Sequence, residues 1–339
     1  MHKKIVCFGE LLLRMSPGTH GEWLRDANIP LYLGGSELNV ATALSNWKLP
    51  VQYLTALPDH ALSKDICDHL VKKRIDISNV VFSGSRIGIY YLARGSDLKH
   101  HGVIYDRQHS SFSELQPATI DWDEILNGVN WFHFSAITPA LNDNIAAVCK
   151  EALMAAEKKG LIISVDLNHR SKLWQYGKQP VDVMTPLVQH CDVIMGNIWS
   201  ANSLLAIGLD ENIHEKKSKD AYLLHASKTA GALMKLFPKC KSVANTFRFD
   251  DLTSLKYYAA LDDKTGQYVS KEFNTTEVSD KAGSGDCFMA GLIYGFTRQH
   301  PLQHVIDFAA AAAFGKLHEV GDATLQTVED VELKLKPHG

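Results

Sequence analysis

The sequence has no run of about 18 apolar residues, the length that a helix needs to cross a membrane. Residues 1–4, Met-His-Lys-Lys, lead directly into a short apolar stretch and lack the hydrophobic core of a signal peptide. Any Cys-x-x-Cys pair is also missing, which argues against a disulfide framework or a zinc site. We therefore expect a cytoplasmic protein with reduced core thiols at its scattered cysteines, positions 7, 67, 149, 191, 240 and 287.

An excess of basic residues is missing as well. The chain carries 35 Lys and Arg against 38 Asp and Glu, so its net charge of −3 creates no positive field for nucleic acid or an anionic membrane. The 16 histidines show no metal-ligand spacing. With 339 residues, 45% of them hydrophobic, the chain can bury a sizeable core, and we expect neither nucleic acid nor a membrane as its partner.

Residues 280–286, Asp-Lys-Ala-Gly-Ser-Gly-Asp, carry the clearest chemical signal in the sequence. From residue 287 to residue 299 the apolar side chains recur at helical spacing, so a glycine-containing turn opens directly into a helix. Glycines let the backbone turn tightly and leave room for a ligand. Because the first amide N–H groups of a helix attract anions, this turn predicts a phosphate site.

Asp286 is the unexpected residue of this turn, because it puts a negative charge where an anion should bind. A P-loop requires Gly-Lys-Ser/Thr, whereas Gly285 precedes Asp286, and the dinucleotide fingerprint requires a glycine where Phe288 stands. Asp286 could favour the helix start as a cap. Alternatively, it could accept a proton from a substrate hydroxyl while the glycine amides hold the phosphoryl group under attack. The turn alone leaves both interpretations open.

A second glycine turn, Gly34-Gly35, precedes another predicted helix, on which Asn39 offers both a donor and an acceptor. For this segment alone, helix capping and close packing are the favoured interpretation. Glu10 follows a buried strand over residues 4–8. It therefore lies at the sheet edge where open α/β folds bind their ligands.

Strand and helix patterns alternate along most of the chain and predict an α/β fold, with a mostly parallel central sheet covered on both faces. Residues 11–33 and 86–108 read instead as short strands and turns and predict a small β-sheet that forms a lid. We also expect a strand over residues 241–246 and a polar loop over residues 210–219. No repeat is visible, and the length suits one large domain or two smaller ones.

The two glycine turns, in this order and at this separation, resemble the ribokinase-like (PfkB) family of carbohydrate kinases over essentially the whole chain. Within that family, three further segments resemble the 2-keto-3-deoxygluconate kinases. They are Gly9-Glu10 leading to Arg14-Met15-Ser16-Pro17, Tyr105-Asp106-Arg107 followed by Ser110-Ser111, and Asp166-Leu167-Asn168-His169-Arg170.

The resemblance implies one catalytic domain over residues 1–339, built as a three-layer α/β sandwich with a lid. It also implies ATP and Mg²⁺ as cofactors, and transfer of the γ-phosphoryl group to a primary hydroxyl of a sugar. It places the catalytic base on Asp286 and the anion hole on Gly283, Ser284 and Gly285. Sugar contacts fall on Gly34, Tyr90, Tyr105, Arg107, Arg170, Glu10 and Asn39. Nucleotide contacts fall on Asn197, Thr246, Arg248, Gly283 and Gly285.

The two arginines favour an acidic sugar independently, because a guanidinium binds a carboxylate through a planar fork. Arg107 and Arg170 both stand where a strand runs out, near the expected crevice. The alternative is that each pairs with a nearby acid such as Asp106 or Asp166, and the spacing alone does not decide.

Three positions depart from the family pattern and concern the metal and the nucleotide. Ser200 stands where a glutamate usually follows Asn197, and Lys281 replaces a small residue. The segment 246–251, where the family usually has a glycine-rich nucleotide loop, contains no glycine. Arg248 could add charge near the phosphates. No metal ligand is assigned for this reason.

Two other functions therefore remain open beside the acid-sugar kinase. One is a kinase for a neutral sugar such as fructose or ribose, and the other is a sugar-binding homologue with impaired catalysis. A lid sheet with one uncovered face also makes a homodimer through the lid a hypothesis.

Overall fold

The computed structural model describes residues 4–17, 23, 28–93, 102–216, 218–250 and 254–336. Its main sheet has ten strands in the spatial order β15-β14-β13-β12-β11-β10-β1-β4-β6, with β16 paired to β14. The parallel part consists of β6 (Ile75–Asp76), β4 (Val51–Leu54), β1 (Lys4–Phe8), β10 (Val129–Ser135), β11 (Ile162–Asp166), β12 (Val193–Gly196) and β13 (Ser242–Asp250). The mostly parallel sheet predicted from the sequence is confirmed.

Strand β1 shows why the sheet is covered on both faces. All four residues from Ile5 to Phe8 are buried, and because side chains alternate along a strand they enter two different cores. Ile5 and Cys7 belong to the core on one face, whereas Val6 and Phe8 belong to the core on the other. The result is the three-layer arrangement that buried, near-continuous apolar strands predict.

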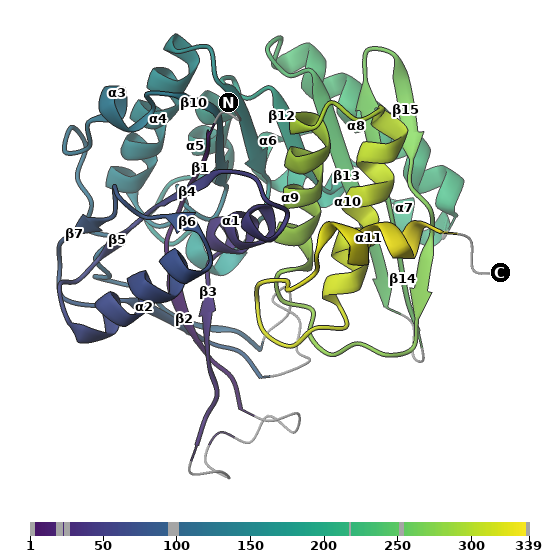
Figure 1. The fold of residues 1–339 in the computed structure, drawn as a ribbon. Coiled ribbons are helices and arrows are strands. Elements are labelled where there is room, and N and C mark those ends of the chain that lie inside the picture. Colours follow the sequence, from purple (N-terminus) through teal and green to yellow (C-terminus); the bar gives the residue numbers. More distant parts are fainter. Residues whose placement is uncertain are drawn as a thin grey trace.

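Helices on the two faces come from different parts of the chain (Figure 1). One face carries α1 (Ser36–Asn46), α2 (Ala61–Lys72), α9 (Ser284–Thr297), α10 (Leu302–Lys316) and α11 (Val328–Leu335). The other carries α3 (Trp122–Ile125), α4 (Asp143–Lys158), α5 (Pro180–Val188), α6 (Ile198–Leu205) and α8 (Lys219–Leu236). Among the described residues, no helix has both the length and the apolar character needed to span a membrane.

One edge of the main sheet is antiparallel. Strand β14 (Leu255–Asp263) pairs antiparallel with β13, β15 (Gly266–Val269) and β16 (Phe273–Thr275). The expectation that the strand from residue 241 ends at 246 is wrong, because β13 continues to Asp250 in register with β14. Phe247 and Phe249 stabilise this extension by packing with Tyr222 of α8 and Tyr258.

A second, four-stranded sheet has the order β3-β2-β8-β9 and projects from the body of the molecule (Figure 1). It consists of β2 (Leu12–Met15), β3 (Leu31–Gly34), β8 (Gly88–Tyr91) and β9 (Ile104–Asp106). The central pair β2 and β8 is parallel and the outer pairs are antiparallel. The predicted small separate sheet is confirmed, while the division into one domain with two lid segments stays a prediction.

Short elements account for the remaining differences from the expectations. The predicted polar loop over residues 210–219 contains a helical turn, α7 (Ile213–Lys216), because Ile213 is buried in the aromatic cluster beside α8. A two-stranded sheet of β5 (Ala56–Leu57) and β7 (Val81–Phe82) and a 3₁₀ turn at Ser171–Leu173 complete the described elements.

Candidate active site

Asp286 lies in the first turn of α9 but does not cap that helix. The N-cap is Gly283, and no side chain caps the helix N-terminus. The Asp286 carboxylate instead accepts hydrogen bonds from α1, from Ser36 Oγ at 2.6 Å and from Asn39 Nδ2 at 2.7 Å. Both donors are neutral, so the carboxylate is held in place without being paired to a cation.

The glycine turn before α9 has the shape of an anion hole. Gly283 adopts φ = +77°, and a Cβ at this position would lie 1.7 Å from the carbonyl oxygen of Asp322, so no other residue fits. A Cβ on Gly285 would meet no described atom within 4 Å, so the turn faces open space. The N–H groups at the start of α9 are therefore accessible to an anion.

Two hollows meet at Asp286. The larger is a cavity of about 450 Å³, and the smaller is a cleft of about 50 Å³. Both are lined by the same five residues, Tyr105, Asn168, Arg170, Gly283 and Asp286. A group at this junction can reach molecules bound on either side.

Most residues predicted to contact the sugar line the smaller cleft and those predicted for the nucleotide line the larger cavity, while Tyr105, Arg170 and Gly283 line both. The smaller cleft is lined by Glu10, Asn39, Tyr90, Tyr105, Arg107 and Arg170. The larger cavity is lined by Asn197, Thr246, Arg248, Gly283, Ser284 and Gly285. Gly34 lines neither hollow, and a Cβ there would lie 2.5 Å from Asp322 Oδ2 and 3.1 Å from the Tyr90 ring. Its position thus allows Tyr90 and Asp322 to approach the backbone closely.

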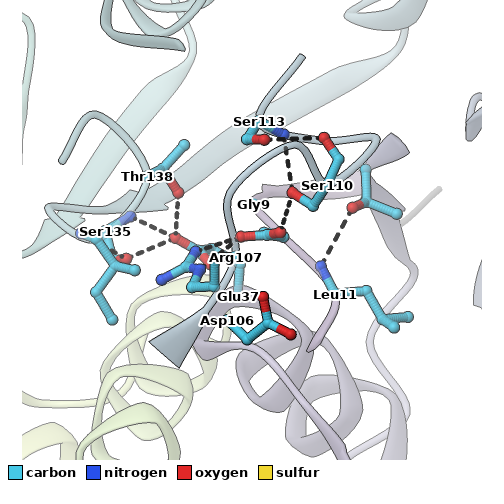
Figure 2. Close-up of polar contacts among 12 residues, drawn as sticks. Gly9, Leu11, Glu37, Asp106, Arg107, Ser110, Ser113, Ser135 and Thr138 are labelled. Carbon is cyan, nitrogen blue, oxygen red and sulfur yellow. Dashed lines mark hydrogen bonds and ion pairs between the residues drawn. The ribbon is translucent and has the colours of Figure 1, made fainter. Parts of the chain in front are cut away.

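Arg107 has an acidic partner, but neither of those considered from the sequence. Its guanidinium contacts Glu10 at 2.6 Å, and Ser110 donates a second hydrogen bond to the same carboxylate (Figure 2). Asp106 pairs instead with Arg86 at 2.8 Å. Because both members of the Glu10–Arg107 pair are buried, Glu10 compensates the charge of Arg107 within the cleft.

Arg170 differs from Arg107 in its surroundings. It is half-buried at the junction of the two hollows, and it donates a hydrogen bond to the carbonyl oxygen of His169 at 3.2 Å. Burial raises the pKa of the Asp286 carboxyl group, and the charge of Arg170 is close enough to oppose that rise. Arg170 is therefore the better placed of the two arginines to meet a negatively charged ligand.

Glu37 anchors α1, whose Ser36 and Asn39 bind the Asp286 carboxylate, and no local pattern in the sequence singled it out. Its fully buried carboxylate accepts hydrogen bonds from the backbone N–H and Oγ of Ser135, at 2.9 and 2.6 Å, and from Thr138 Oγ1 at 3.0 Å (Figure 2). These contacts fix the start of α1 against the carboxyl end of β10. They thereby fix the position of Ser36 and Asn39.

A buried ionic cluster beside the cleft was also missed. Arg14 of β2 contacts Asp280 with one arm and Asp322 with the other, the second at 2.7 Å, and is fully buried. The Tyr90 hydroxyl donates to the other oxygen of Asp322. Burial raises the pKa of Asp322 to about 6, against the opposing charge of Arg14. The sequence does show an arginine inside an apolar strand, which indicates a buried charge. This local pattern does not reveal which distant residues pair with the arginine.

Burial also raises the pKa of Asp286 above its ordinary value, while the hydrogen bonds from Asn39 and Ser36 oppose this shift. If Asp286 is the general base, as the resemblance implies, activity is lost as the pH falls through this raised pKa, because a base must be deprotonated to act. We expect the acidic limb of kcat/KM to lie above the range of an exposed aspartate. Ser36→Ala removes one opposing hydrogen bond and should move the limb to higher pH.

The pH profile of kcat/KM for the two proteins checks this expectation. Ser45→Ala is the matched control, because Ser45 lies on the same helix but its hydroxyl donates to the carbonyl oxygen of Lys73. An unchanged limb in Ser36→Ala, or an equal shift in the control, would contradict the assignment.

Comparison with known proteins defines the class. The family described as "pfkB family carbohydrate kinase" matches this sequence over residues 2–228 and 257–327. The chain therefore belongs to the pfkB family of carbohydrate kinases, and the ribokinase-like fold expected from its motifs is confirmed.

Within the family, the similar proteins include kinases of keto-deoxy sugars. A 2-dehydro-3-deoxygalactonokinase from Haloferax volcanii is 27% identical, with 99% of this chain and 98% of that protein covered. The crystal structure of a 2-dehydro-3-deoxygluconokinase from Thermotoga maritima is 32% identical with a TM-score of 0.89, and 98% of each chain is covered. A putative ribokinase II from E. coli in complex with ATP and Mg²⁺ shares the fold at 15% identity, with a TM-score of 0.76 and all of both chains covered.

Proposed function

We propose that this carbohydrate kinase transfers the γ-phosphoryl group of ATP to the primary hydroxyl of 2-keto-3-deoxygluconate. The observation that carries the proposal is the position of Asp286, at the junction of the two hollows and beside the Gly283–Ser284–Gly285 turn. In this assignment the sugar occupies the smaller cleft and the nucleotide the larger cavity.

The geometry supports a single in-line displacement. Asp286 accepts the proton of the sugar hydroxyl, whose oxygen forms a bond to the γ-phosphorus as the bond from phosphorus to the bridging oxygen of ADP breaks. The N–H groups at the start of α9 stabilise the negative charge on the phosphoryl oxygens. Ser36 and Asn39 keep the carboxylate oriented.

The keto-deoxy acid is favoured over a neutral sugar by Arg170 at the junction and by the names of similar proteins. Arg107 adds a planar guanidinium to the cleft, although Glu10 balances its charge. We infer that Arg170 supplies the net positive charge that meets the substrate carboxylate. This interpretation also predicts that replacing Arg170 lowers activity toward the acid sugar selectively, whereas replacing Arg107 lowers activity toward every sugar.

Mg²⁺ is proposed as the companion of ATP. Among the described residues no group of three or more His, Cys, Asp or Glu side chains could hold a metal by itself. Besides the proposed base Asp286, the cavity does contain the carboxylate of Asp166. One or two carboxylates suit Mg²⁺, which takes its other ligands from phosphates and water. The ion would neutralise phosphate charge there.

Steady-state kinetics with a panel of sugars tests the proposal. We expect the wild type to prefer 2-keto-3-deoxygluconate over fructose and ribose. Arg170→Leu should lower kcat/KM for the acid sugar by about 100-fold, because a charge-assisted hydrogen bond to a carboxylate is lost. At a pH well above the acidic limb, where the loss of Arg170 leaves Asp286 deprotonated, its kcat/KM for fructose should change little.

Arg107→Leu serves as the comparison in the same assay. It leaves Glu10 buried without its cation, so the protein should lose thermal stability and activity toward every sugar alike. A wild type that prefers fructose or ribose would reject the acid-sugar assignment. An Arg170→Leu variant whose kcat/KM falls equally for all sugars would reject the role of Arg170.

A cytoplasmic location and a homodimer through the small sheet are further proposals. Leu31 and Ile104 lie on the two edge strands of that sheet and are 51% and 57% exposed. Exposed apolar side chains on edge strands favour pairing. Sedimentation velocity of a Leu31→Lys, Ile104→Lys variant tests whether the sheet mediates association.

A further inference from the structure

Tyr257 lines the larger cavity, and its hydroxyl group forms no hydrogen bond that stabilises the described fold. The residue belongs to β14 and is 3% exposed. Its Oη has no hydrogen-bond partner among the described residues. Buried polar groups in native proteins are almost always paired, so a buried, unpaired hydroxyl on a residue that lines a cavity points to a partner that binds there.

The cavity that Tyr257 lines also contains two basic side chains, besides the carboxylate of Asp166. Arg248 is the direct cross-strand neighbour of Tyr257 on β13, and it lines the same cavity. Lys281, which precedes the glycine turn, lines it too and contacts Asp250 at 3.0 Å. Burial raises the pKa of Tyr257, so the hydroxyl stays protonated at neutral pH and acts as a donor.

These groups match a phosphate better than a nucleobase. Phosphate oxygens are acceptors, and tyrosine hydroxyl, lysine ammonium and arginine guanidinium all donate hydrogen bonds to them. The cavity wall that contains them also contains Gly283, Ser284 and Gly285 at the start of α9. No glycine lies between Ser242 and Asp263, so side chains cover the backbone of β13 and β14 here.

We propose that the Tyr257 hydroxyl, together with Lys281, binds the terminal phosphates of ATP. This inference rests on the proposed function, because it assigns the nucleotide to the larger cavity. In this inference, β14 and the segment before α9 supply the side-chain donors that position the phosphates opposite Asp286.

Calorimetric titration of the full-length protein with Mg·ATP and with AMP, in the absence of sugar, tests the proposal. Tyr257→Phe removes only the hydroxyl and keeps the ring. We expect it to weaken ATP binding about tenfold or more, the effect of losing one hydrogen bond to a charged group. Binding of AMP, which lacks the terminal phosphates, should stay within about twofold of the wild type.

Tyr258→Phe is the matched control. Tyr258 is the next residue of the same strand, but it belongs to the aromatic cluster beside α8, and it lies outside both hollows. The control should bind both nucleotides like the wild type. Lys281→Met tests the second donor at a partly exposed position, and it should also weaken ATP binding while sparing AMP.

Three results would overturn the inference. They are unchanged ATP affinity in Tyr257→Phe, an equal loss of ATP and AMP binding, and a wild type that binds no ATP. The last would also remove the proposed function. If the wild type binds ATP but phosphorylates no sugar, the proposed function fails, whereas a selective loss of ATP binding in Tyr257→Phe still supports the phosphate site.

Discussion

Asp286→Asn is expected to lower kcat by about a thousandfold, within the range found for positioned general bases. The asparagine amide has the same shape as the carboxylate but cannot accept the hydroxyl proton. The cleft and the cavity keep their other linings, so the Kd values for sugar and for ATP should stay within about threefold. Steady-state kinetics and calorimetry on the same preparation measure the two quantities separately.

The control must exclude a general effect of charge at a helix start. Asp182 is the acidic residue in the first turn of α5, and it is exposed and outside both hollows. Asp182→Asn removes the same charge from an equivalent helix position and should leave kcat unchanged. Near-normal turnover in Asp286→Asn would show that its carboxylate only stabilises α9, which was the alternative left open by the sequence.

Features encoded locally in the sequence predicted the fold well. The boundaries of β1 agree with the expected strand over residues 4–8, because an apolar run followed by Gly9 is a local signal. The strand predicted over residues 241–246 was too short, because β13 ends at Asp250, and the reason differs. The alternation of Phe247 and Phe249 with polar residues continues the strand pattern, but only the packing against Tyr222 and Tyr258 from other elements makes that pattern a strand.

The candidate site shows the same division between local and distant information. The turn at Gly283 could be recognised because its glycines and Asp286 are neighbours in the chain. The partner of Arg107 could not, because Glu10 lies 97 residues away and nearer acids were equally plausible from spacing. Arg14 contacts residues 266 and 308 positions away, and no local pattern specifies such a pair. Tertiary contacts between charges therefore account for most of what the sequence left open.

Arg14→Leu is expected to destabilise the folded protein by about 3–5 kcal/mol, the effect of breaking a buried ion pair by removing one partner. Asp280 and Asp322 would both remain buried without their cation. Arg86→Leu is the control, because Arg86 pairs with Asp106 at a partly exposed site and such pairs contribute about 0.2–1 kcal/mol. Denaturant unfolding at fixed pH measures both changes.

The pH dependence separates lost charge compensation from lost packing. The pKa of Asp322 is already raised to about 6 in the folded protein. A carboxyl group whose pKa is raised by folding binds more protons in the folded state, so its contribution to stability falls as the pH rises toward that pKa. In the wild type this fall ends near pH 6. Without Arg14 the pKa rises further, so the destabilisation should grow between pH 6 and pH 8.

The same cluster should transmit the change to catalysis. Asp280 accepts hydrogen bonds from the backbone N–H groups of Ala282 and Gly321, so Arg14 holds the segment that leads into the glycine turn. Arg14→Leu should therefore lower kcat even at pH values where the protein remains folded, and Arg14→Lys should recover part of it by restoring the charge. If Arg14 orients the glycine turn, its removal must move the N–H groups at the start of α9 and lower kcat. A destabilisation independent of pH, with normal kcat in the folded protein, would therefore show that Arg14 only fills space in the core.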